Sequence, residues 1–123
     1  MAEGASTRWA APELIAPDPT NQKHVSVSHC TDAWSFGMLC LELMTGERPF
    51  HDRLWDIHVA MALQEGKLPE RPGQPAISRG LSDGLWEIMM QCWNHTPQSR
   101  PSMSKVKEML RALPPTPVPS PGT

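Results

Sequence analysis

The chain has 123 residues, which suits one domain and leaves no room for a second of ordinary size. Its formal net charge is −2, without a block of like charge, so the sequence indicates no surface for nucleic acid or for an anionic membrane. The three cysteines (Cys30, Cys40 and Cys92) form neither a metal-binding pair nor a disulfide framework, and no signal pattern opens the chain. A cytosolic or nuclear protein is therefore expected, with Cys40 and Cys92 as buried thiols.

Residues 1–30 are predicted to be mostly loop, because three prolines and a polar run at 20–24 interrupt any regular pattern. At most one helical turn fits, from Pro12 to Ile15, since proline is tolerated at the first helical position.

The strongest helix prediction covers residues 32–45. Thr31 is an acceptable N-cap, Asp32 places negative charge in the first turn, and Gly46 supplies the left-handed residue common just after a helix. Apolar residues between these limits cover every face of the helix, which predicts that protein surrounds it. The segment is shorter than the roughly 20 residues needed to span a bilayer, and Glu42 interrupts it. We therefore expect a buried central helix.

A second helix is predicted from Leu54 to Glu65, with Ile57, Met61 and either Leu54 or Ala60 sharing one face. Residues 67–81, with three prolines, are expected to be irregular.

A third helix is predicted to begin after Ser82 as N-cap, and it carries an apolar stripe of Leu85, Ile88, Met89, Cys92 and Trp93. The last helix is predicted over residues 102–113, with an inward face of Met103, Val106, Met109, Leu110 and Leu113. Residues 114–123 hold five prolines and are predicted to be a disordered, solvated tail. The expected architecture is mostly helical, with no strand.

Two charged residues are candidates for a structural contact. Glu13 and Arg100 each adjoin a proline and apolar residues, where an unpaired charge is costly. They are either two separate exposed side chains or an ion pair that ties the N-terminal loop to the segment before the last helix. By contrast, the five histidines have no spacing suited to zinc, and no glycine-rich phosphate loop is present.

Several of these segments resemble the C-terminal part of a eukaryotic protein kinase domain. The matching motifs are Ala-Pro-Glu at 11–13, Asp-x-Trp-Ser-Phe-Gly at 32–37, Gly-x-x-Pro-Phe at 46–50 and a late arginine at 100. Arg8-Trp9 and the Cys92-Trp93 to Met103 segment resemble the tyrosine-kinase-like and tyrosine kinase branches. We favour the first branch, which typically acts on Ser or Thr. The resemblance covers about residues 4–113.

The resemblance implies a helical C-terminal lobe, with about four helices around a buried central helix. It implies a partial kinase domain over residues 1–113, followed by the tail at 114–123. It also implies a substrate-side loop containing Thr7, Arg8 and Trp9. Glu13 and Arg100 would form the family's ion pair, and Asp32 would be the buried carboxylate that holds the catalytic loop.

The family uses ATP and Mg, but the glycine-rich loop, the strand lysine, the catalytic Asp with its Asn partner and the Asp-Phe-Gly motif are absent from these 123 residues. No catalytic, cofactor-binding or metal residue is therefore assigned, and the chain is expected to be inactive alone, as an incomplete gene product or a relic. The alternative is a non-catalytic, pseudokinase-like binding module for a protein partner, acting through the Thr7 loop and the 54–65 helix. The helices and loops that cover one side of the central helix in kinases are not among these 123 residues. We therefore also expect an exposed apolar patch and self-association or chaperone binding.

Overall fold

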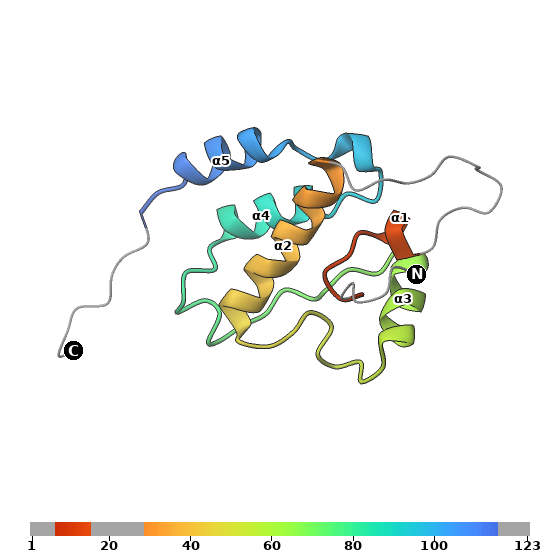
Figure 1. Cartoon of the computed structure of the whole chain (residues 1–123). Coiled ribbons are helices and arrows are strands. Elements are labelled where there is room, and N and C mark those ends of the chain that lie inside the picture. Colours follow the sequence, from red (N-terminus) through yellow and green to blue (C-terminus); the bar gives the residue numbers. More distant parts are fainter. Residues whose placement is uncertain (1–6, 16–28, 116–123) are drawn as a thin grey trace.

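A computed structural model describes residues 7–15 and 29–115 of the chain (Figure 1). Its elements, in chain order, are α1 (Pro12–Ile15), α2 (His29–Thr45), α3 (Asp56–Gln64), α4 (Asp83–Cys92), the 3₁₀ turn η1 (Pro97–Ser99) and α5 (Met103–Arg111). No strand occurs within these two ranges. The prediction of a mostly helical fold is confirmed.

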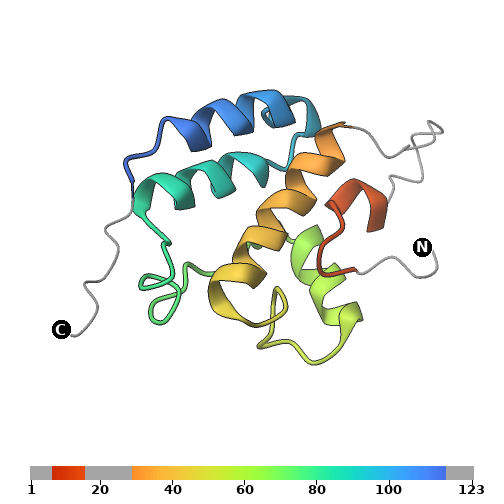
Figure 2. The same cartoon turned by 60° about the vertical axis from the view of Figure 1, so that its left-hand side comes forward.

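Helix α2 lies in the middle of the other elements. In both views α4 and α5 lie on one side of it, and α1 and α3 lie on the other (Figures 1 and 2). The side chains of Trp34 and Met38 are fully buried. However, Leu39 is 46% exposed and Leu43 is 64% exposed, so the expectation that protein covers α2 on every side is wrong. One face of the central helix remains open, as expected for the predicted apolar patch.

The two ends of α2 differ in how well they follow the sequence pattern. The helix begins at His29, so Thr31 lies inside it and is buried rather than acting as its N-cap. At the other end Gly46 has a φ of 77°, and its N–H donates to the carbonyl of Glu42 at 2.7 Å. A left-handed glycine therefore closes the helix as predicted.

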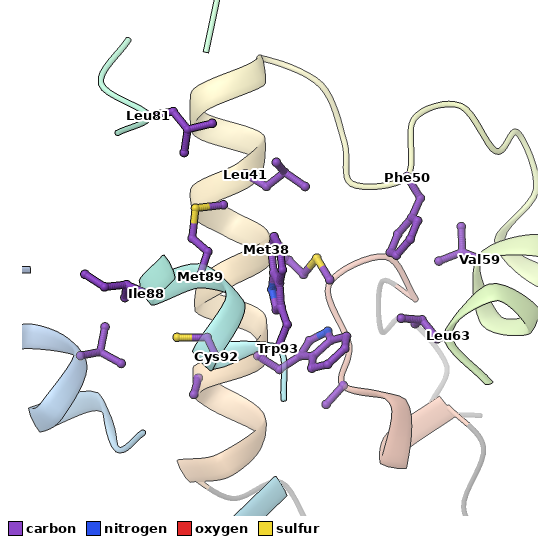
Figure 3. Close-up of a cluster of buried hydrophobic side chains, with 14 of the residues drawn as sticks. Met38, Leu41, Phe50, Val59, Leu63, Leu81, Ile88, Met89, Cys92 and Trp93 are labelled. Carbon is purple, nitrogen blue, oxygen red and sulfur yellow. The ribbon is translucent and has the colours of Figure 1, made fainter. Parts of the chain in front are cut away.

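Helix α3 packs through the face opposite to the predicted one. Val59 and Leu63 are buried, together with Ala60 and Ala62. Ile57 and Met61, which the sequence pattern grouped on one face, are 64% and 51% exposed. Figure 3 shows Val59 and Leu63 pointing toward the side of α2 that carries Met38. Because α3 has apolar residues on two faces, periodicity alone did not determine which face would be buried.

Helices α4 and α5 follow the sequence prediction closely. The Ser82 hydroxyl accepts from the N–H of Leu85, and the Ser102 hydroxyl accepts from the N–H of Lys105, both at 3.1 Å. These are N-cap contacts of the expected kind. The α4 stripe enters the core, where Ile88, Met89, Cys92 and Trp93 are buried and Leu85 is half-buried.

On the inward face of α5, Val106 is buried and the other predicted residues are half-buried. The segment at 67–81 contains no regular helix or strand, as predicted. Most of the predicted tail, residues 116–123, lies outside the described part of the chain.

Candidate functional site

Glu13 and Arg100 form a bidentate ion pair. Arg100 Nη1 donates to Glu13 Oε2 at 2.7 Å, and Arg100 Nη2 donates to Glu13 Oε1 at 2.9 Å. The Arg100 side chain is fully buried and that of Glu13 is 16% exposed. The two charges therefore interact where water screens them little, and the parallel geometry is the strong form of this contact.

Arg100 makes three further contacts that use the rest of its guanidinium. Nη1 also donates to the carbonyl of Cys30 at 3.0 Å, and Nε donates to the carbonyl of Asn94 at 2.7 Å. Its carbon Cζ lies 5.0 Å from the centre of the Trp34 ring, a cation–π distance. One buried side chain thus joins α1, the start of α2 and the segment between α4 and η1.

Arg8 is the second buried arginine. Its Nη1 donates to the carbonyls of Pro49 at 3.1 Å and Phe50 at 2.7 Å, and its Nη2 donates to the carbonyl of Arg53 at 2.6 Å. Its Nε completes the set by donating to Asp56 at 3.1 Å. These contacts direct Arg8 into the protein, so it fixes the turn at 49–53 to the N-terminal loop.

The neighbours of Arg8 place the rest of this loop against α2. The backbone carbonyl of Trp9 accepts from the Ser35 hydroxyl at 2.8 Å, and the Trp9 indole N–H donates to Glu42 at 3.2 Å. Thr7 is buried, and its carbonyl accepts from the N–H of Ala10 at 3.3 Å. The loop from Thr7 to Ala11 is consequently held from several directions by defined contacts.

Asp32 does not lie where the resemblance implied. Its side chain is exposed at the start of α2 rather than buried. Its carboxylate accepts no hydrogen bond among the residues that the structure describes. It lies on the same open side of α2 as Leu39 and Leu43, so its surroundings in this chain are solvent.

Of the two thiols predicted to be buried, Cys92 is buried and Cys40 is half-buried, and both are poor nucleophiles. Burial raises the pKa of Cys40 from 9.0 to about 11. Burial also raises the pKa of Cys92 to about 11, with a smaller raising effect from nearby Cys40 and an opposing one from Arg100. Both thiols are neutral at pH 7, so neither supplies the thiolate that thiol chemistry requires.

Within residues 7–15 and 29–115, no group of three or more His, Cys, Asp or Glu side chains is arranged to hold a metal ion. None of the described helices has the length and apolarity required to span a membrane.

Sequence reasoning brought Glu13 and Arg100 together but missed how Arg8 acts. Arg8 was grouped with Thr7 and Trp9 only as part of a substrate-side loop. Its buried carbonyl partners lie more than 40 residues away in sequence. No local pattern marks backbone carbonyls as acceptors, so only the folded turn shows this contact.

Comparison with known proteins identifies the family of the chain. A family model described as protein tyrosine and serine/threonine kinase matches residues 2–110. The chain is 32% identical over 106 residues to the dual specificity protein kinase shkD of Dictyostelium discoideum, covering 85% of this chain and 12% of that protein. It is 31% identical over 111 residues to mitogen-activated protein kinase kinase kinase 12 of Rattus norvegicus, covering 86% of this chain and 10% of that protein.

A third relative is named as inactive. The chain is 35% identical over 106 residues to inactive tyrosine-protein kinase 7 of Gallus gallus, covering 84% of this chain and 9% of that protein. The chain thus spans about a tenth of the length of each of these relatives. The family model, which matches most of the chain, decides the assignment. The chain belongs to the protein tyrosine and serine/threonine kinase family.

Proposed function

We propose that these residues form the substrate-side part of a protein kinase domain, in which the loop from Thr7 to Ala11 positions a protein whose Ser or Thr hydroxyl receives phosphate from ATP. The observation that carries this proposal is the fixation of that loop. Arg8 ties it to the turn at 49–53, Trp9 ties it to α2, and Glu13 ties its end to Arg100. A loop held in this way is preorganised to orient a reacting group.

The 123 residues by themselves are proposed to be inactive. Phosphoryl transfer depends on positioning the phosphates and on neutralising their charge with metal ions and basic side chains. The motifs that do this in kinases are absent from the sequence. Incubating the chain with labelled ATP, Mg²⁺ and acceptor peptides should give no transfer above a blank, and ATP should not raise its melting temperature. Transfer that depends on protein concentration would contradict this part of the proposal.

A chimera tests the substrate-side role. Residues 2–110 replace the matching segment in the kinase domain of the rat relative, and transfer to peptides carrying Ser, Thr or Tyr is measured. The chimera should remain active, with Ser and Thr peptides preferred over the Tyr peptide. The variant Arg8→Gln should lower kcat/KM by about tenfold or more because the loop loses its attachment. Lys107→Gln, at an exposed position on α5, is the matched control and should leave kcat/KM unchanged.

An active chimera whose kcat/KM is the same with and without Arg8→Gln would contradict the role given to the loop. Preference for the Tyr peptide would leave the role of the loop unchanged and would change only the proposed acceptor, from Ser or Thr to Tyr.

A second candidate function is a non-catalytic module that binds another protein through α3 and the two residues before it. The observation in its favour is the exposure of Leu54, Trp55 and Ile57, which are 74%, 65% and 64% accessible. Large exposed apolar side chains that lie together commonly mark protein-binding surfaces. Similarity to a relative named as an inactive kinase also favours it.

The first partner to test is a second copy of the chain, which presents the same apolar side chains. Sedimentation velocity should show association that Trp55→Ser and Ile57→Ser weaken together. Lys107→Gln again serves as the control. Unchanged association in the double variant would remove the support for this second function.

A further inference from the structure

A pocket of about 430 Å³ lies on the side of the molecule away from α5. It is enclosed by the C-terminal half of α2, the turn at 48–53 and the extended segment at 67–72. Its volume falls in the range of roughly 300–1,000 Å³ typical of small-ligand sites. Neither the Glu13–Arg100 pair nor the Thr7 side chain lines it, so this pocket is separate from the substrate-side loop.

The inner wall of the pocket is apolar. Leu41 and Phe50 line it and are themselves 5% and 6% exposed. Leu68, Pro69 and Pro72 also line it. A ligand that enters would therefore gain by burying an apolar group against these side chains.

Charged side chains surround this apolar wall. The basic ones are Arg48, Arg53, Lys67 and Arg71, and the acidic ones are Asp52 and Glu70. Lys67 pairs with Glu65 at 3.0 Å, and Arg71 pairs with Asp83. By contrast, neither Arg48 nor Arg53 has a carboxylate partner within the described residues. Arg53 is also half-buried, a setting in which a guanidinium gains from an anionic partner.

The turn that carries both arginines is fixed before any ligand arrives. Phe50 has a φ of 55°, a left-handed conformation that is costly for a residue with a bulky side chain. The buried Arg8 guanidinium offsets this cost by donating hydrogen bonds to three carbonyls in this turn, those of Pro49, Phe50 and Arg53. Because these contacts are internal, ligand binding need not order the turn.

We propose that this pocket binds an anionic group attached to an apolar body, a phosphate monoester or carboxylate beside a hydrophobic side chain, as in a phosphorylated or acidic peptide segment. The apolar body lies against Leu41, Phe50 and Leu68. The anion receives hydrogen bonds from Arg53 and, at the exposed edge, from Arg48. This binding does not require phosphoryl transfer, so it stands independently of the proposed kinase role.

The test uses the full 123-residue chain and three small probes of similar size. Phenyl phosphate and phenylacetate carry the two anions, and benzyl alcohol is the neutral match. Amide chemical shifts are followed by NMR during each titration. Both anions should cause saturable shifts within residues 48–53 and 67–72, whereas benzyl alcohol should cause none at the same concentration. Comparing the two anions distinguishes a phosphorylated segment from an acidic one as the natural source.

Charge variants locate the anion. Arg53→Gln should weaken binding of the preferred anion by about fivefold or more, and Arg48→Gln should weaken it less because that side chain is more exposed. Both substitutions leave the carbonyls that Arg8 binds in place, so the turn should persist. Lys107→Gln on α5 removes the same charge outside the pocket and should have no effect. Equal binding by benzyl alcohol, shifts outside the two segments, absence of saturation, or unchanged affinity in Arg53→Gln would each overturn the proposal.

Discussion

The guanidinium of Arg100 holds both carboxylate oxygens of Glu13 while lying against the face of Trp34. The pair joins two segments 87 residues apart in the chain. A contact of this separation gains nothing from local structure, so it depends on the whole fold being formed. It links α1 directly to the core around α2.

Arg8 should contribute to stability nearly as much as Arg100. Replacing it with glutamine leaves buried carbonyls in the turn at 49–53 without their donors, at a cost of about 3 kcal/mol. Urea unfolding should show this loss, and amide exchange of Arg53, whose N–H donates to Phe50, should speed up. Arg111→Gln, at an exposed position, is the control. If the two variants unfold at the same urea concentration, Arg8 has no such structural role.

Gly37 should not tolerate even a methyl group. A Cβ at this position of α2 would overlap the indole of Trp93, which is itself buried. Gly37→Ala is therefore expected to destabilise the chain by about 1–3 kcal/mol through overpacking. At Gly73 the same change meets nothing within 4 Å, so Gly73→Ala should unfold like the parent. Thermal melts of both variants measure this difference. A Gly37→Ala variant as stable as the parent would contradict the close packing of Gly37 against Trp93.

The raised thiol pKa values predict a loss of stability at alkaline pH. Folding favours the neutral forms of Cys40 and Cys92, so each contributes stability that is fully present below pH 9, their pKa when unfolded. That contribution is lost as pH rises toward about 11, because the unfolded chain releases its thiol protons first.

Urea unfolding at pH 8 and pH 10.5 measures this effect. The chain has no tyrosine to titrate in this range, and the lysines are common to parent and variant. The double variant Cys40→Ala, Cys92→Ala should lose less stability between the two pH values than the parent does. Parallel losses would argue against the raised pKa values.

The open face of α2 should make the chain bind hydrophobic dye and associate with itself. Leu39→Gln with Leu43→Gln should reduce ANS fluorescence and the apparent mass on gel filtration, while changing stability by only about 0.5 kcal/mol, as at exposed sites. Leu41 lies between these two residues in the sequence but is buried, so Leu41→Gln should instead unfold the chain. A parent chain that binds no dye and runs as a compact monomer would contradict the exposed patch.

The sequence was sufficient where one physical signal dominated. Ser82 and Ser102 each stand before a single apolar stripe, so both the start and the inward face of α4 and α5 could be predicted. Helix α3 has apolar residues on two faces, and only the tertiary packing of Val59 and Leu63 decides between them. The start of α2 was misplaced because Thr31, a good N-cap by residue type, is buried inside the helix.

In the candidate site, too, some contacts could be predicted from the sequence and others depend on the folded structure. Two charges next to apolar residues made an ion pair of Glu13 and Arg100 one of two alternatives, and the resemblance to kinases favoured it. The contacts of Arg8 could not, since its partners are backbone carbonyls that every residue type possesses. Asp32 was assigned through resemblance, and its exposure in this structure reflects the open side of α2.

A double-mutant cycle on Glu13 and Arg100 tests most directly whether this ion pair organises the lobe. Urea unfolding gives the stability of Glu13→Ala, Arg100→Ala, the double variant and the parent. Each single substitution should cost about 3–5 kcal/mol, since it leaves the other charge buried alone. The double variant should cost well below their sum, with a coupling of about 2 kcal/mol or more. Strictly additive losses, or single variants as stable as the parent, would show that the pair does not hold the lobe together.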